Sequence, residues 1–304
     1  MNFRALFYFI LISFLTPIYS QAQEENLSAE YREGFSAYAR NVLRLKHFDI
    51  ILVPGFLSDT VIATGRHPLL NRLGLGHYFD DQLRWFHENK VHAIRTKIES
   101  EEIPDVNAQF IRGQIEKAKR PVILITHSKG SVDALHSLIQ YPELQKKVKG
   151  WISLQGGFGG SPVADWIDDS ACLGKCAGWL LKRMGGTRES LKSLRESDSK
   201  VYLQANADEI ASFQKRIPVI SFGSWIDRQP WRLNTLLFLT RNAMLEDGIK
   251  NDGLVPVSNT VLPGSKIVQI PDVDHADPVM KSWVRHFDRV KMTQALCSML
   301  LKRI

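Results

Sequence analysis

Residues 121–140 read PVILITHSKGSVDALHSLIQ, and this stretch decides the fold class. Its first part is a short apolar run rich in β-branched residues, which is typical of a buried strand. The sequence His127-Ser128-Lys129-Gly130 then forms a sharp turn, and apolar residues at helical spacing follow it. A buried strand that turns directly into a helix is typical of parallel sheets covered by helices.

Other segments extend the same pattern along the chain. Five more apolar runs are expected to form strands: 49–56, 90–98, 150–156, 217–225 and 266–271. Helices are expected between them, over 106–120 for example, and the last helix over 282–304. The predicted fold class is therefore α/β, with a mostly parallel central sheet and helices on both faces. Residues 161–215 hold no convincing strand, and we expect a helical cap or lid insertion there.

The N-terminal segment has the three-part pattern of a secretory signal peptide. Residues 1–22 read MNFRALFYFILISFLTPIYSQA, with Arg4 before an apolar run over 6–15. The small residues Ser20 and Ala22 then precede a potential cleavage site. Because the apolar run is short for a membrane span, we expect a cleaved signal peptide rather than a retained anchor. The mature protein is then periplasmic or secreted.

The rest of the chain, 23–304, is long enough to form one α/β domain. Of 304 residues, 44% are hydrophobic and 23% charged, which excludes a mainly disordered chain and a multi-span membrane protein. The formal net charge is +7, which is compatible with transient contact with a membrane or lipid surface. No recognised nucleic-acid-binding motif accompanies that charge, so we expect no nucleic acid partner.

Three cysteines bear on the redox chemistry of an exported chain. Cys172 and Cys176 lie in CLGKC, a spacing that could close a small disulfide loop in an oxidising compartment. Cys297 is then left over, and we expect it to be buried on the last helix. Three cysteines without a paired CxxC do not make a zinc site.

Ser128 is the candidate nucleophile, because a strained turn between strand and helix lifts its hydroxyl off the sheet. A serine needs a base, and the base needs an orienting carboxylate. His275 directly follows the run at 266–271, and Asp252 lies on a tight Asn-Asp-Gly loop before it. We expect His275 as base and Asp252 as acid. Three other acids remain as alternatives: Asp227, Asp247 and Asp274.

An oxyanion hole is the third requirement of this chemistry, since backbone N–H groups stabilise the charge on the reacting oxygen. Lys129 follows the nucleophile at a helix start and offers one N–H. The loop VPGFL (53–57) follows the first core strand, and we expect Phe56 to supply the second.

Five separated motifs, THSKG, VPGF, ISLQGGFGGSPVADWI, NDGLVP and DHAD, resemble the secreted bacterial triacylglycerol lipases and esterases of the α/β-hydrolase superfamily. The resemblance covers most of residues 48–280. It implies an α/β-hydrolase fold, Ser128 as nucleophile, Asp252 as acid, His275 as base, and Phe56 and Lys129 as oxyanion donors.

The chain departs from that family at three motifs. Pro54 replaces the usual His of the oxyanion loop, Thr126 replaces the first Gly of G-H-S-x-G, and 157–161 read GFGGS instead of P-H-x-G-S. The family often binds a structural calcium through an Asp that matches Asp277, but the matching downstream residue here is Lys281. Calcium needs six to eight oxygen ligands, so it is a weak expectation, and no other cofactor is expected.

These residues predict an exported serine hydrolase that cleaves carboxylic esters as a lipase or esterase. Transfer of the acyl group to an alcohol, and thioesters as substrates, use the same triad and remain alternatives. A catalytically silent fold that binds ligands at the cell envelope is the alternative from another class. Apolar residues at helical spacing in 163–186 would form either a mobile lid or a permanently packed cap over the substrate pocket.

Overall fold

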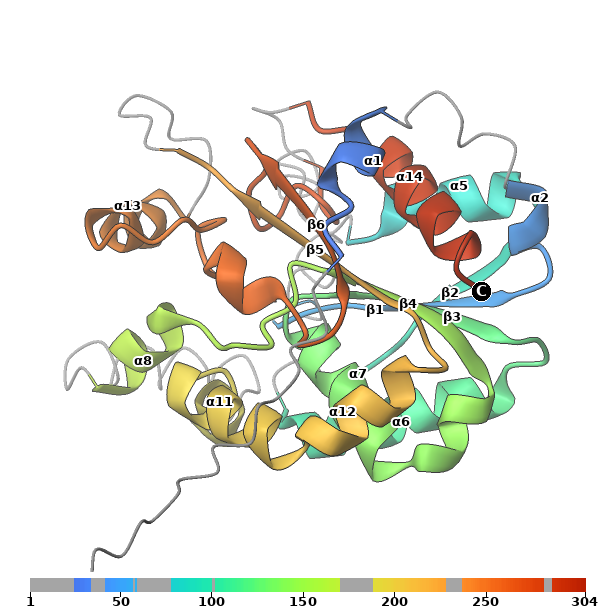
Figure 1. The fold of residues 1–304 in the computed structure, drawn as a ribbon, viewed down its shortest axis with the longest axis horizontal. Helices are drawn as coiled ribbons and strands as arrows, with labels where there is room; N and C mark the ends of the chain where they lie inside the picture. The colour runs from blue at the N-terminus through green and yellow to red at the C-terminus, as the bar shows by residue number, and fades with distance from the viewer. Residues whose placement is uncertain are drawn as a thin grey trace, which may run out of the picture.

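The computed structural model describes residues 25–33, 42–56, 58, 78–99, 102–169, 188–227, 237–281 and 286–304. Within these residues one parallel sheet has the strand order β2-β1-β3-β4-β5-β6 (Figure 1). The strands are β1 (Asp49–Val53), β2 (His92–Arg95), β3 (Val122–His127), β4 (Val148–Leu154), β5 (Val219–Trp225) and β6 (Lys266–Pro271). Each apolar run expected to form a strand overlaps one of them, although β4 begins at Val148, before the predicted run at 150–156. The predicted α/β class is confirmed.

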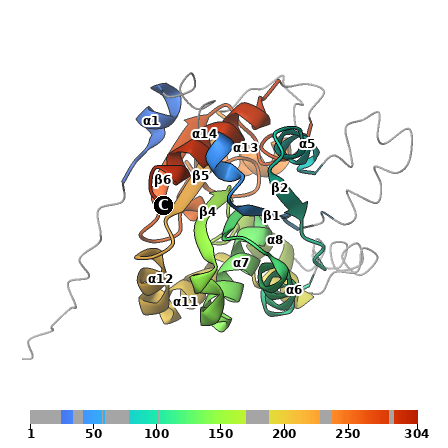
Figure 2. The same ribbon diagram turned by 90° about the vertical axis from the view of Figure 1, so that its right-hand side faces the viewer.

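Helices cover both faces of the sheet, as two perpendicular views show (Figures 1 and 2). One face carries α1 (Ser28–Glu33), α2 (Val42–Leu45), α5 (Asp80–Glu88) and α14 (Arg289–Leu301). The other carries α6 (Pro104–Lys117), α7 (Lys129–Gln140), α11 (Glu196–Ala205) and α12 (Ala207–Gln214). The remaining described elements are η3 (Pro142–Lys146), α8 (Pro162–Asp169), α10 (Arg188–Lys192), α13 (Phe238–Glu246) and η4 (Val257–Thr260).

The strands are buried on both faces because their side chains alternate between two cores. In β1, Ile50 and Leu52 join the core beneath α14, whereas Ile51 and Val53 join the core beneath α6 and α7. The parallel register pairs Val53 with Thr126. The carboxyl ends of these two central strands therefore lie side by side, at the edge where their following loops meet.

The expected cap region divides into two parts. Ile210 and Phe213 of α12 are buried in the same core as Trp151 of β4, so α12 is a helix of the sheet's own covering layer. By contrast, α8 and α10 pack on each other outside that core. Among the described helices of 161–215, α8 and α10 are therefore the two that lie outside the layer covering the sheet.

The last helix is shorter than the sequence pattern predicted. It begins at Arg289, because the Asp288 carboxylate accepts a hydrogen bond from the Lys291 N–H at 2.9 Å and caps the first turn. Cys297 is buried on this helix, as expected, and burial raises the pKa of its thiol to about 12. The predicted signal peptide at 1–22 and the cysteines Cys172 and Cys176 lie outside the described residues. Among the described helices, no segment has the length and apolar character that a membrane crossing needs.

Candidate active site

Ser128 occupies a strained turn between β3 and α7. Its backbone has φ 53° and ψ −130°, a conformation that residues other than glycine rarely adopt. The turn is possible because Gly130 lacks a side chain: a Cβ there would lie 2.2 Å from the Pro54 carbonyl oxygen. Lys129 is the first residue of α7, so its backbone N–H has no acceptor within the helix. This N–H is available beside the Ser128 hydroxyl.

Thr126, the departure from the family's elbow glycine, is accommodated by buried hydrogen bonds. Its hydroxyl accepts from Trp151 Nε1 at 2.8 Å and pairs with Ser131 Oγ at 2.7 Å. Ser153 Oγ donates to the same Ser131 oxygen at 2.9 Å. A buried hydroxyl with partners costs little, so the threonine supports the turn from below instead of distorting it.

Ser128, His275 and Asp252 are joined by two hydrogen bonds. Ser128 Oγ lies 2.9 Å from His275 Nε2, and His275 Nδ1 lies 2.8 Å from Asp252 Oδ2. A carboxylate oxygen only accepts, so Nδ1 carries the proton and Nε2 presents its lone pair to the serine hydroxyl. Asp252 is fully buried and His275 is 6% exposed, so water does not compete strongly for either bond.

Asp252 is held in place by its own loop. Its Oδ1 accepts from the backbone N–H groups of Leu254 at 3.0 Å and Val255 at 2.8 Å. Its backbone carbonyl accepts from the His275 N–H at 3.0 Å. Gly253 adopts φ +109°, a backbone conformation that L side chains rarely adopt. The loop therefore orients the carboxylate that faces the imidazole.

The three alternative acids lie elsewhere. Asp227 and Asp247 are exposed. Asp274 is buried, but its Oδ1 accepts from the backbone N–H groups of Ala276 at 2.8 Å and Asp277 at 2.9 Å. It shapes the turn that carries the histidine, and its carboxylate does not reach the imidazole.

The expected oxyanion loop packs directly against Ser128. A Cβ on Gly55 would lie 2.8 Å from the Ser128 Cβ, so only glycine permits this approach. The Gly55 N–H donates to the Tyr78 hydroxyl at 2.9 Å. That N–H is therefore not available to a substrate, which leaves the N–H of the next residue, Phe56, as the loop's candidate donor.

His127, next to Ser128 in the sequence, forms a hydrogen bond with the backbone carbonyl of His275. Its Nε2 lies 2.8 Å from the His275 carbonyl oxygen and its Nδ1 2.5 Å from the Tyr78 hydroxyl. Gln155 also reaches His127 Nε2, at 3.2 Å, and donates to the Asp274 carbonyl at 2.8 Å. Neither Tyr78 nor Gln155 was among the predicted site residues. Tyr78 belongs to no motif, and Gln155 lies in ISLQGGFGGSPVADWI, but its contacts with His127 and the Asp274 carbonyl cross between segments far apart in the sequence.

A buried ion pair lies beneath the start of α7. Lys129 Nζ lies 2.8 Å and 3.1 Å from the two Asp133 carboxylate oxygens, and both side chains are 1% exposed. Asn107 Nδ2 donates to Asp133 Oδ2 at 3.0 Å. Burial raises the pKa of Asp133 to about 6, although the Lys129 ammonium opposes this shift. The side chain of Lys129 thus points toward Asp133 and not toward the Ser128 hydroxyl, so only the backbone of Lys129 faces the candidate site.

The residues around Asp277 do not fit a calcium ion. Its Oδ2 accepts from the Asp274 N–H at 3.1 Å, and Lys281 stands where a second acidic ligand would be needed. The described part of the chain holds no group of three or more His, Cys, Asp or Glu side chains arranged to bind a metal. Asp277 instead stabilises the turn that precedes it.

Apolar side chains from α8 and α10 lie against the oxyanion loop. Phe56 and Ile167 of α8 both pack against a cluster formed by the buried side chains of Ala164 in α8 and Leu191 in α10. Arg195 fixes α8 to the start of α11, since its guanidinium lies 2.9 Å from Asp165 and 2.8 Å from Asp168. These helices form an apolar wall against Phe56, in the loop whose Gly55 packs on Ser128.

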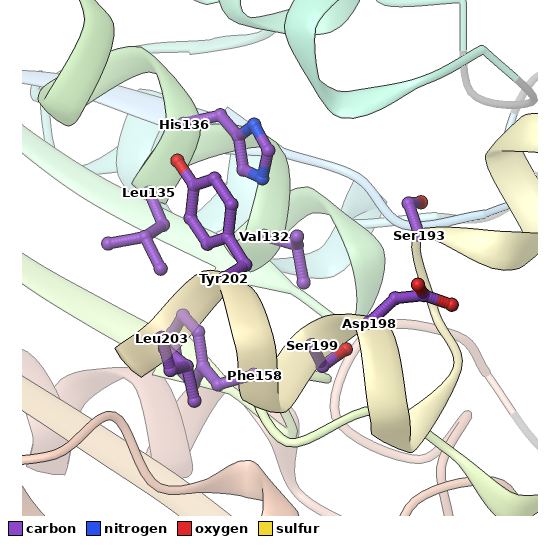
Figure 3. Close-up of a pocket in the computed structure, with 9 residues that line it drawn as sticks. All are labelled: Val132, Leu135, His136, Phe158, Ser193, Asp198, Ser199, Tyr202 and Leu203. Atoms are coloured by element: carbon purple, nitrogen blue, oxygen red, sulfur yellow. The ribbon is translucent and has the colours of Figure 1, made fainter. Parts of the chain in front are cut away.

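A separate cavity of about 150 Å³ lies between α7 and α11 (Figure 3). Leu135 and His136 of α7 and Tyr202 and Leu203 of α11 line it. The rings of His136 and Tyr202 stack with centroids 3.9 Å apart. Neither Ser128 nor its two partners line this cavity, so it is distinct from the candidate active site.

Comparisons with known proteins agree with this architecture. No protein-family model and no curated protein matches the chain. The crystal structure of the metagenomic carboxyl esterase MGS0156 is similar at 20% identity and a TM-score of 0.67, covering 85% of this chain and 77% of that one. The mature form of the Bacillus licheniformis lipase BlEst2 is similar at 19% identity and a TM-score of 0.57, covering 76% and 85%. The chain therefore has the α/β-hydrolase fold that its motifs implied.

Proposed function

We propose that the protein is a serine hydrolase that cleaves carboxylic esters, as a lipase or esterase. One observation carries the proposal: the unbroken hydrogen-bonded line from Ser128 through His275 to Asp252. Nothing in a purely structural role calls for a strained serine, a histidine with a free lone pair and a buried carboxylate in this order. The esterase and lipase structures that share the fold support the same class of reaction.

The reaction has two halves. His275 Nε2 takes the Ser128 hydroxyl proton while Oγ bonds to the ester carbonyl carbon, and the negative charge that develops on the carbonyl oxygen is stabilised by the N–H groups of Lys129 and Phe56. The C–O bond to the alcohol then breaks, and the imidazolium returns the proton to the leaving oxygen. In the second half, water loses a proton to His275 and attacks the acyl-enzyme, which releases the acid and restores Ser128. Asp252 stabilises the imidazolium throughout.

The apolar wall of Phe56, α8 and α10 favours an acyl group with hydrocarbon character. The loss of hydration on burying such a chain contributes about 0.8 kcal/mol per methylene. We therefore propose an ester or lipid as substrate, with transient contact to a lipid surface where the substrate resides in one.

The test uses the mature protein and its Ser128→Ala variant, which removes only the attacking oxygen. Both are treated with a fluorophosphonate probe and assayed with short-chain and long-chain p-nitrophenyl esters. We expect labelling and turnover in the wild type alone, and the chain-length profile separates an esterase from a lipase. A folded wild type with neither labelling nor turnover would contradict the proposal and favour a silent binding protein. Labelling with acyl transfer to added alcohols in preference to water would indicate an acyltransferase.

Export is a further part of the proposal and rests on the sequence pattern of residues 1–22. N-terminal sequencing of the protein recovered outside the cytoplasm is expected to start near Gln23. An uncleaved chain confined to the membrane fraction would identify a retained anchor instead.

A further inference from the structure

Two buried polar side chains beside Ser128 have no role in the proposed chemistry. Tyr78 is 4% exposed and His127 is 2% exposed, and their rings meet edge to face with centroids 5.7 Å apart. The His127 ring also contacts the His275 ring, at 4.7 Å between centroids. Burying two polar side chains next to a reaction centre is costly unless every polar atom finds a partner.

The directions of their hydrogen bonds follow from chemistry alone. The His275 carbonyl only accepts, so His127 Nε2 carries the ring proton and donates it at 2.8 Å. His127 Nδ1 is then unprotonated and accepts from the Tyr78 hydroxyl at 2.5 Å. The Tyr78 oxygen in turn accepts from the Gly55 N–H at 2.9 Å. Donors and acceptors alternate without conflict along three consecutive bonds.

The hydrogen bonds of Gln155 lead to the same position for the His127 ring proton. Its Nε2 donates to the Asp274 carbonyl at 2.8 Å and to Ser224 Oγ at 2.5 Å, so its Oε1 faces His127. That oxygen, 3.2 Å from His127 Nε2, again accepts a proton from this nitrogen. One imidazole N–H is therefore shared by two acceptors on the polar side of the loop that carries the base.

The side chains of Tyr78 and His127 are both uncharged. Burial, and then the neighbouring His275, lower the pKa of His127 well below its ordinary value. Burial raises the pKa of Tyr78 above its ordinary value, against the opposing bond from Gly55. A neutral imidazole and a neutral phenol have fixed donor and acceptor atoms, so the bonds keep one direction over the whole range in which the protein is expected to work.

We propose that Tyr78 and His127 are positioning residues that hold the oxyanion loop and the base His275 at a fixed separation, through the bonds Gly55 to Tyr78 to His127 to His275. The inference rests on the proposed ester hydrolysis. It gives a role to His127, in the turn between β3 and α7, and to Tyr78, which lies 23 residues along the chain from Gly55. A misplacement of the oxyanion donors or the base by about 1 Å is enough to slow such a reaction about 100-fold.

The kinetic test breaks the central bond from either side. Tyr78→Phe removes only the hydroxyl and keeps the ring. His127→Gln can place its amide NH2 where Nε2 donates to the His275 carbonyl, and it leaves no acceptor at the position of Nδ1, which faces Tyr78. Each is expected to lower kcat by about 10- to 100-fold with KM changed less than about threefold. Because both variants cut the same bond, the double variant is expected to be no slower than the slower single one. Ser221→Ala is the control, since it deletes a buried hydroxyl bonded to Ser265 in the sheet and leaves kcat unchanged.

Multiplicative losses in the double variant, or an unchanged kcat in Tyr78→Phe, would overturn the proposal. A second readout does not need turnover: the ring nitrogen resonances of histidine, recorded by NMR between pH 5 and 9. His127 is expected to remain the neutral Nε2–H form, and Tyr78→Phe but not Ser221→Ala is expected to shift the His275 resonances. If the wild type shows this pattern without hydrolysing esters, the proposed function fails, but the positioning role of Tyr78 and His127 is supported. If His127 titrates in this range, or if the His275 resonances do not respond to Tyr78→Phe, the positioning role is refuted, whether or not the protein hydrolyses esters.

Discussion

Substitution of either partner in the ion pair between Lys129 and Asp133 should strongly lower the stability of the fold. The charges lie 2.8 Å apart and each side chain is 1% exposed. Removing one partner leaves the other charge buried without compensation, which costs about 3–5 kcal/mol. At about 2–4 °C per kcal/mol for a domain approaching this size, Lys129→Met and Asp133→Asn should each lower the Tm by roughly 10 °C. The measurements are urea unfolding followed by circular dichroism, and thermal melts.

The double variant Lys129→Met with Asp133→Asn should recover most of that loss. Asparagine still offers an oxygen to Asn107 Nδ2, and no charge is left in the core. We expect the double variant to lie within about 1 kcal/mol of the wild type, since replacing a buried pair by neutral groups is often close to neutral. Arg112 and Glu116 supply the matched control, because they have the same i,i+4 spacing at 2.7 Å but are 42% and 48% exposed. Arg112→Met should cost less than about 0.5 kcal/mol.

The loss in Lys129→Met should depend on pH. Burial already raises the pKa of Asp133 to about 6 in the wild type, and removal of the ammonium raises it further. The folded protein then holds a proton that the unfolded chain releases above about pH 4, so stability falls as pH rises from there through the folded pKa. Lys129→Met should therefore be closer to the wild type at pH 5 than at pH 8. A double variant whose loss equals the sum of the two single losses would refute the reasoning, because the two charges would then be uncoupled.

Three further predictions concern the site and the core. Asp252→Asn should lower kcat by about 10⁴-fold while the protein stays folded, because the amide favours the wrong tautomer of the base; steady-state kinetics beside a thermal melt measure both. Gly130→Ala should destabilise by at least about 1–3 kcal/mol, since its Cβ has no room, whereas Gly113→Ala in α6 should stabilise by about 0.5–1 kcal/mol because nothing lies within 4 Å. Equal unfolding midpoints for these two variants would contradict the packing described. Cys297 should resist iodoacetamide at pH 8 until the protein is denatured, which peptide mass spectrometry shows, because burial raises its pKa to about 12; rapid alkylation of the native protein would disprove its burial.

The sequence was most informative where the physics is local. Alternation of apolar runs with helical patterns located the strands, since each pattern is set by residues a few positions apart. It was less informative at boundaries: the cap on the last helix depends on one bond from Asp288, and an apolar pattern alone extends past it. The range 161–215 is a second example. The sequence predicted helices there, but it did not separate α12, which packs in the core on the sheet, from α8, which packs outside it.

The sequence by itself determined the α/β class and supplied Ser128, Asp252 and His275 as candidates in the expected order. Only the tertiary structure distinguished Asp252 from Asp274, because that choice depends on which carboxylate reaches an imidazole across the fold. The same is true of the bond between Ser128 and His275, which are 147 residues apart. Backbone sterics and side-chain periodicity act over a few residues, so their effects can be predicted from the amino-acid sequence. Contacts between loops depend on the order in which strands join a sheet, and there the carboxyl ends of distant strands meet at one edge.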